Sequence, residues 1–182
     1  YYMGNYLIKD DVLAGKTPQQ QDQILREGIS FLKRSVELNP TFTDAWNQMG
    51  LAYFRLKENE TAKDAFNKGI KTNPNEPTIY NNLGNVLFGE KDYKACIELF
   101  QKAVKLNPNY SEAWANLGSV YGMMGNYDMA IPNFEKAIAA DPNNQLATYF
   151  LGITWRNKGN EMLAKQYLDR SDQLKAAKEA MK

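Results

Sequence analysis

The chain has 182 residues, a formal net charge of +1, and acidic and basic side chains interspersed along its length. This balance gives no polyanion-binding surface, so nucleic acid is disfavoured as a partner. A single cysteine allows no internal disulfide, and the absence of histidine removes the commonest general base and every Ser-His or Cys-His arrangement. A metal site would have to be built from carboxylates. Composition therefore predicts a non-enzymatic chain without cofactor or metal.

No apolar run approaches the roughly 20 residues that a membrane-spanning helix needs, and the first residues lack the basic and apolar segments of a signal peptide. The sequence opens at Tyr1 without an initiator methionine. We therefore expect it to be a piece of a longer protein. A cytoplasmic location is slightly favoured, and a membrane-anchored parent protein stays open.

The first 42 residues are expected to contain an incomplete helical unit. Thr17 as N-cap, Pro18 at the first helical position and Gln20 three residues after the cap form a capping box. A helix is therefore predicted from about Pro18 to Leu38. An insertion is expected just before it, around residues 11–18.

The reason for that insertion is the position of Gly4. The stretch 2–7 resembles the later stretch 82–87, so Gly4 corresponds to Gly84. Gly4 nevertheless lies further from Gly50 than one repeat of 34 residues allows. The extra residues are expected to separate the two helices of the first unit.

Three complete units follow, at 43–76, 77–110 and 111–144. The best-defined one reads W-x2-L-G-x2-Y from Trp114, then A-x3-F-x2-A from Ala130, and ends at Pro142. The pattern recurs one period earlier from Tyr80 and two periods earlier from Trp46. Each unit is predicted to be two helices joined by a polar turn, and each first helix is expected to begin after a proline and a capping residue. These capping residues are predicted to be Thr41, Asn75, Asn109 and Asn143.

A divergent last unit spans 145–182. It keeps Leu151 and Gly152, has Thr148 where the other units have an aromatic residue, and has Ala176 where the closing proline should be. Its last helix therefore lacks a stop signal and is predicted to run to about Ala180, as a polar tail suited to capping the stack.

This pattern resembles the tetratricopeptide repeat, a helix-turn-helix unit of 34 residues. The resemblance implies an all-α fold, a right-handed α-solenoid of antiparallel helix pairs that spans the whole chain as one domain. It also implies that the first helices of the units line a concave surface.

Glycine inside a helix costs about 1 kcal/mol relative to alanine, so the recurrent helical glycines indicate close approach of two helix backbones. Small residues of the second helices are expected to meet that crossing, with Phe66, Phe100, Phe134 and Leu168 beside it. Cys96 occupies one of these small positions. It is therefore interpreted as a buried core residue and not as a nucleophile.

Candidate binding residues are those that the repeat pattern leaves free on the first helices. They combine carboxamides, which can bond both groups of a peptide main chain, with aromatic side chains that could form apolar pockets. The predicted peptide-binding residues are Asn47, Gln48, Phe54, Asn81, Asn82, Asn85, Phe88, Glu112, Asn116, Ser119, Tyr149, Phe150 and Arg156.

Asn82 and Asn116, with Gln48 as a near substitute, resemble the asparagine ladder inside the tetratricopeptide superhelix of protein O-linked N-acetylglucosamine transferases. That resemblance implies contacts with the main chain of an extended polypeptide, and Phe150 interrupts the row. The carboxylate clamp of heat-shock chaperone cofactors is not matched, because Glu112 and Asn116 stand where its basic pair should be.

The leading interpretation is a non-catalytic scaffold that holds an extended peptide or a partner helix in a concave groove. Self-assembly is an alternative, through Tyr1, Tyr2, Tyr6 and Leu7 of the incomplete first unit. An accessory region of a larger enzyme, such as a glycosyltransferase, or of a membrane-anchored protein is another. The first interpretation requires a protein or peptide partner, and the second a homo-oligomer.

Overall fold

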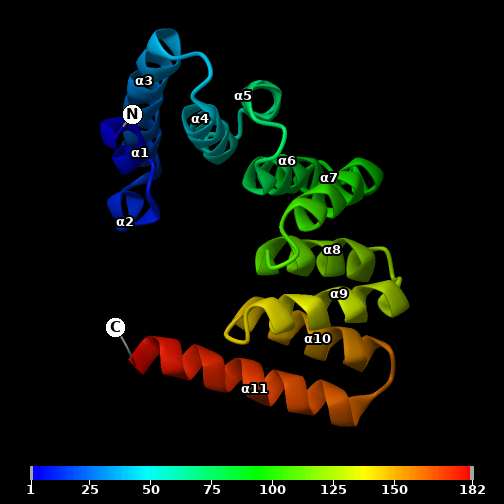
Figure 1. The fold of residues 1–182 in the computed structure, drawn as a ribbon. Helices are drawn as coiled ribbons and strands as arrows, with labels where there is room; N and C mark the ends of the chain where they lie inside the picture. The colour runs from blue at the N-terminus through cyan, green and yellow to red at the C-terminus, as the bar shows by residue number, and fades with distance from the viewer. Residues whose placement is uncertain (1, 181–182) are drawn as a thin grey trace. The chain divides into compact units, whose positions relative to one another are not determined.

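The computed structural model describes residues 2–180, and every regular element in that range is an α-helix (Figure 1). The predicted all-α class is confirmed. The chain divides into two compact units, Tyr1–Lys91 and Asp92–Lys182. Tyr1 and the side chains of Tyr2 and Tyr6, on which the self-assembly interpretation rests, lie outside the described part of the structure.

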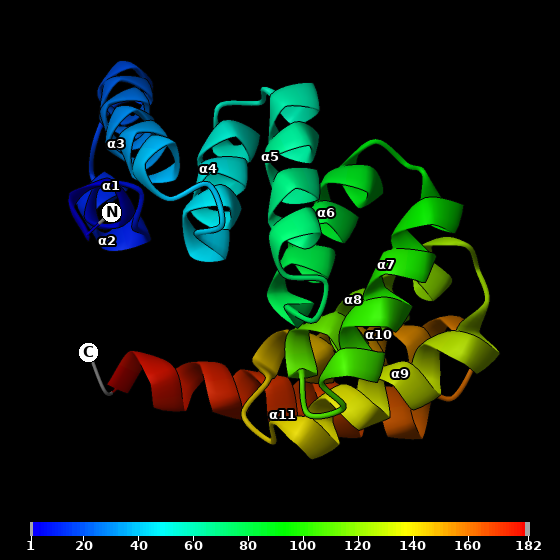
Figure 2. The ribbon, with the colours of Figure 1, turned by 45° about the horizontal axis from the view of Figure 1, so that its top comes forward.

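The structure describes six helices within residues 2–91 of the first unit. They are α1 (Tyr2–Leu7), α2 (Asp10–Leu13), α3 (Pro18–Leu38), α4 (Thr43–Arg55), α5 (Asn59–Thr72) and α6 (Pro77–Gly89). Within this unit α3 packs against α4, α4 against α5 and α5 against α6, and α4 also contacts α6. Short α1 lies against α3, as both views show (Figure 2).

Five helices are described in the second unit, between residues 92 and 180. They are α7 (Tyr93–Leu106), α8 (Ser111–Met123), α9 (Tyr127–Ala140), α10 (Gln145–Asn157) and α11 (Glu161–Ala180). Here α8 packs on α7 and α9, and α10 packs on α9 and α11. The last helix runs past Ala176, where the other units have a closing proline, to Ala180, the last residue that the structure describes. Pro132 lies inside α9, where it lacks an N–H for the helical bond, yet the helix continues through it.

The predicted start of α3 is confirmed. The Thr17 backbone N–H donates to Gln20 Oε1 at 2.9 Å, and the Gln20 N–H donates to Thr17 Oγ1 at 3.3 Å. The segment expected as an insertion, around residues 11–18, overlaps the short helix α2, which begins one residue earlier. A Cβ on Gly4 would lie 2.8 Å from the Gly28 carbonyl oxygen, so α1 and α3 meet backbone to backbone as the glycine pattern predicts.

The predicted capping residues of the first helices are wrong by one position. The N-caps are Phe42, Glu76, Tyr110 and Asn144, and only Glu76 and Asn144 accept a backbone N–H through their side chains. The residue before each proline instead forms an Asx turn. Asn39, Asn73, Asn107 and Asp141 accept the N–H two residues on, at 3.0–3.2 Å.

The aromatic residue of each complete unit has a polar role as well as an apolar one. Trp46 Nε1, Tyr80 Oη and Trp114 Nε1 each donate to the carbonyl oxygen of the preceding proline, at 2.8–2.9 Å. In the last unit the Thr148 hydroxyl donates to the Asn144 carbonyl oxygen at the start of its own helix. Arg170 of α11 donates to Pro142 O at 3.2 Å. A long side chain from another helix thus replaces the missing aromatic donor.

The helical glycines lie where two helices cross. A Cβ on Gly50 would lie 2.5 Å from Phe66, one on Gly118 would lie 2.7 Å from Phe134, and one on Gly152 would lie 2.8 Å from Leu168. These distances are too short for any real Cβ. The glycines therefore allow buried Phe66 and Phe134 and half-buried Leu168 to fill the crossings.

Candidate functional site

In the first unit the structure brings two predicted carboxamides together. Asn82 Nδ2 on α6 donates to Asn47 Oδ1 on α4 at 2.9 Å, and Asn47 is only 8% exposed. The bond joins equivalent faces of two successive repeats. It orients the Asn82 side chain and gives the buried Asn47 oxygen a donor, so Asn82 has a structural role in addition to any role in binding.

The other predicted residues of this unit lie on the same two helices. Gln48 and Phe54 belong to α4 and are half-buried. On α6, Asn81 is buried, and Asn85 and Phe88 are half-buried. On both helices the carboxamides therefore precede a half-buried phenylalanine near the end of the helix.

In the second unit an aromatic pair among the predicted residues is exposed. Tyr149 and Phe150 on α10 are each 40% exposed, and their rings meet edge to face with centroids 5.4 Å apart. Phe150 also stacks on buried Phe134, with centroids 6.2 Å apart. The core thus holds one ring of the pair in place while both keep exposed surface.

The remaining predicted residues of the second unit lie on α8 and α10. Asn116 and Ser119 on α8 are half-buried, and the Ser119 hydroxyl donates to Ala115 O at 2.9 Å. Glu112 at the start of α8 and Arg156 at the end of α10 are exposed. The two helices that carry these groups, α8 and α10, contact each other.

Sequence reasoning missed a hollow at the beginning of this surface. It has a volume of about 590 Å³ and lies between the starts of α8 and α10 and the end of α11. Glu112 borders it together with Leu146, which is 61% exposed, and with Lys175 and Lys178 of α11. The sequence signal for this hollow was Leu146, an apolar residue in the first turn of a helix.

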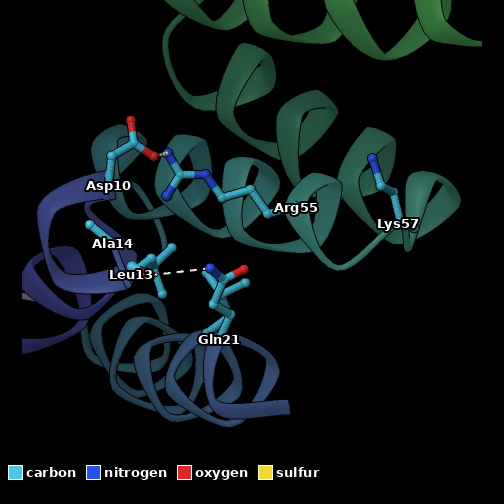
Figure 3. A pocket seen from close by; sticks show the side chains of 7 residues that line it. Asp10, Leu13, Ala14, Gln21, Arg55 and Lys57 are labelled. Carbon is cyan, nitrogen blue, oxygen red and sulfur yellow. Dashed lines mark hydrogen bonds and ion pairs between the residues drawn. The ribbon is translucent and has the colours of Figure 1, made fainter. Parts of the chain in front are cut away.

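A second hollow, in the first unit, is a structural junction (Figure 3). Arg55 at the end of α4 donates through Nη1 to Ile8 O and through Nη2 to Asp10 Oδ1, the latter at 2.7 Å. Gln21 Nε2 donates to Leu13 O at 3.1 Å. These bonds attach the inserted segment to α3 and α4, so its polar groups are engaged within the chain.

Arg55→Ala should therefore loosen the insertion without unfolding the unit. We expect the amides of Leu13 and Ala14 to exchange about tenfold faster, since a hydrogen bond from a charged group contributes about 1.5–3 kcal/mol. Hydrogen exchange measured by mass spectrometry checks this. Arg34→Ala, which removes an exposed pair with Glu37 on α3, is the control and should leave these amides unchanged.

Cys96 is fully buried, and its thiol donates to Tyr93 O at 3.3 Å. Burial, followed by the charge of Asp92, raises its pKa from 9.0 to about 11. The thiol therefore stays protonated at neutral pH, which agrees with a core role. Within residues 2–180 no three His, Cys, Asp or Glu side chains gather as a metal site, and no helix is long and apolar enough to cross a membrane.

Family models of the tetratricopeptide repeat match residues 43–76, 75–143 and 115–179. The chain belongs to the tetratricopeptide-repeat family. Membership of this family supports a role as a protein-interaction scaffold. Among curated proteins, none matches the sequence.

Several solved structures share the tetratricopeptide fold. A MamA structure is 24% identical with a TM-score of 0.76, and the match covers 89% of this chain and 95% of that one. PilF of Pseudomonas aeruginosa is 21% identical with a TM-score of 0.78, covering 94% of this chain and 76% of that one. YrrB, described as having an unusual peptide-binding site, is 27% identical with a TM-score of 0.66, covering 82% and 77%.

Proposed function

We propose that this tetratricopeptide-repeat chain is a non-catalytic scaffold whose first helices hold an extended peptide or a partner helix. The exposed aromatic pair of α10, Tyr149 and Phe150, carries the proposal, because ordered aromatic rings at a surface are typical anchors of protein interfaces. The carboxamides of α4, α6 and α8 add groups that bond a peptide main chain independently of its sequence.

Asn82 offers more than its bond to Asn47. Only one of its two amide N–H groups is used in that bond, and its oxygen is an additional acceptor. A carboxamide held in one orientation loses less side-chain entropy when a ligand binds. The bond between the two repeats therefore supports peptide binding at Asn82.

The double variant Asn82→Ala/Asn116→Ala should capture about tenfold less partner from a lysate of the source cell, with the retained proteins measured by mass spectrometry. A matched control separates binding from folding. Asn47→Ala breaks the same bond from its buried side and should cost about 1 kcal/mol of unfolding free energy, with a smaller loss of capture than the double variant, because Asn82 keeps its own carboxamide.

Equal loss of capture in the control and in the double variant would show that Asn82 acts only through folding. Undiminished capture by the double variant would remove the carboxamides from the proposal. Light scattering of the pure chain over a range of concentrations tests the self-assembly alternative, for which the molar mass must rise.

A further inference from the structure

Each unit has a groove on the side of its second helices, away from the candidate site. In the second unit it lies between α7 and α9, has a volume of about 400 Å³, and has a floor of Trp114, Leu117 and Tyr121. In the first unit the corresponding groove lies between α3 and α5, with a volume of about 310 Å³ and a floor that includes Trp46 and Tyr53. The residues that line the two grooves match position for position, two repeats apart.

The two grooves differ in charge although their floors match. In the first, Glu37 and Asp64 accompany the lysines, and Lys68 Nζ forms an ion pair with Asp64 at 2.8 Å. In the second, Lys105 and Pro132 stand at the positions of Glu37 and Asp64. The second groove therefore has two lysines and no carboxylate among the residues that line it.

The lysines of the second groove lack ion-pair partners. Within the part of the chain that the structure describes, no carboxylate pairs with Lys105 or Lys136. Lys136 Nζ instead lies 4.3 Å from the centroid of the Trp114 ring, closer than Lys68 lies to Trp46, at 5.1 Å. This contact holds an ammonium group directly over the apolar floor.

Apolar groups complete the rim of the same groove. Met129 is 44% exposed there, and Pro132 is exposed beside it. The Asn133 side chain donates to Met129 O at 2.7 Å, so its amide nitrogen is engaged within α9. A ligand that fits this groove needs an apolar side chain for the floor and negative charge for the lysines.

We propose that the groove between α7 and α9 binds an acidic peptide segment of a partner protein. An apolar side chain of that segment packs against Trp114, and carboxylates on either side pair with Lys105 and Lys136. Charge complementarity selects this occupant, and the groove of the first unit does not accept it, because its two carboxylates offset its lysines. A nucleic acid is a poorer fit, because a phosphate backbone requires a longer track of cations than two lysines.

The test uses a fluorescein-labelled peptide in which one phenylalanine is flanked by glutamates, with fluorescence anisotropy as the readout. The wild-type chain should bind it at a single site, and added salt should weaken the binding. A peptide with lysines in place of the glutamates should not bind. Failure of the acidic peptide to bind, or equal binding of both peptides, would overturn the proposal.

The repeats supply a matched variant. Lys105→Glu/Pro132→Asp gives the second groove the residues that the first one has at the same positions. This variant should bind the acidic peptide at least about tenfold more weakly, and its melting curve should be unchanged. If that variant does not fold, Lys105→Gln/Lys136→Gln must show the same loss of affinity for the acidic peptide. Conversely, Glu37→Lys/Asp64→Asn should create a second binding site in the first unit.

Two other occupants give distinct results. A single-stranded oligothymidylate that binds as well as the peptide and competes with it would assign the groove to phosphate and refute the peptide. A molar mass that rises with concentration, and that Lys105→Glu returns to the monomer value, would assign it to a second copy of the chain. Unchanged peptide affinity in Lys105→Glu/Pro132→Asp would contradict the proposal outright.

Discussion

Phe134→Ala is expected to lower the free energy of unfolding by about 3–5 kcal/mol, the usual cost of truncating a buried phenylalanine. Phe134 is 1% exposed and belongs to a buried cluster that includes Ala130, Ala147 and Leu151. It also supports the ring of Phe150. Urea unfolding followed by circular dichroism measures the loss.

The crossing at Gly118 gives this prediction a second, independent check. Gly118→Ala alone should cost about 1–3 kcal/mol, because its Cβ would lie 2.7 Å from the Phe134 ring. In the Phe134→Ala background the same change should cost much less, since the obstructing ring is gone. Additive costs would contradict the packing seen at this crossing.

Met123→Ala is the control for both changes. Met123 lies at the end of α8 and is 66% exposed, so its truncation should change the unfolding free energy by no more than about 0.5 kcal/mol. A loss comparable to that of Phe134→Ala would mean that unfolding does not report on the buried cluster.

The largest expected effect on binding comes from Tyr149→Ala/Phe150→Ala. An aromatic anchor at the centre of an interface contributes about 2 kcal/mol or more, so affinity for the captured partner should fall at least about 30-fold. Isothermal titration with that partner measures the change. The melting temperature must be recorded as well, because Phe150 stacks on Phe134.

Two variants limit the interpretation of that loss. Tyr149→Phe keeps the ring and should retain most of the affinity. Met162→Ala removes an apolar side chain that is 82% exposed on α11, outside the proposed site, and should bind normally. If Met162→Ala weakens binding as much as the double variant, the partner does not use the first helices.

The helices could be predicted from the sequence because local signals specify them. The capping box at Thr17, the recurrent glycines and the absence of a proline at Ala176 each act over a few residues, and the corresponding helix boundaries and crossings are found in the structure. The caps of the first helices were misplaced, because Asx turns at residues such as Asn73 compete for the same backbone groups.

The candidate residues were chosen by their position within a repeat, which identifies a helix face and not a contact. The bond from Asn82 to Asn47 joins different positions of two successive repeats. Which positions pair depends on the distance and orientation that α5 sets between α4 and α6. Arg170, which replaces an aromatic donor from 28 residues away in sequence, could not be found from the repeat pattern for the same reason.

The sequence by itself determined the repeat frame, the family and the small or aromatic residues at each crossing, because the same pattern of buried residue types recurs in each unit along the chain. Only the tertiary structure decided which polar groups are used within the fold and which are left for a ligand. Asn47 is paired, Arg55 attaches the insertion, and Lys136 lies over Trp114 without a carboxylate partner in the described chain. Side-chain contacts between repeats depend on distances between helices, and those distances are set by packing.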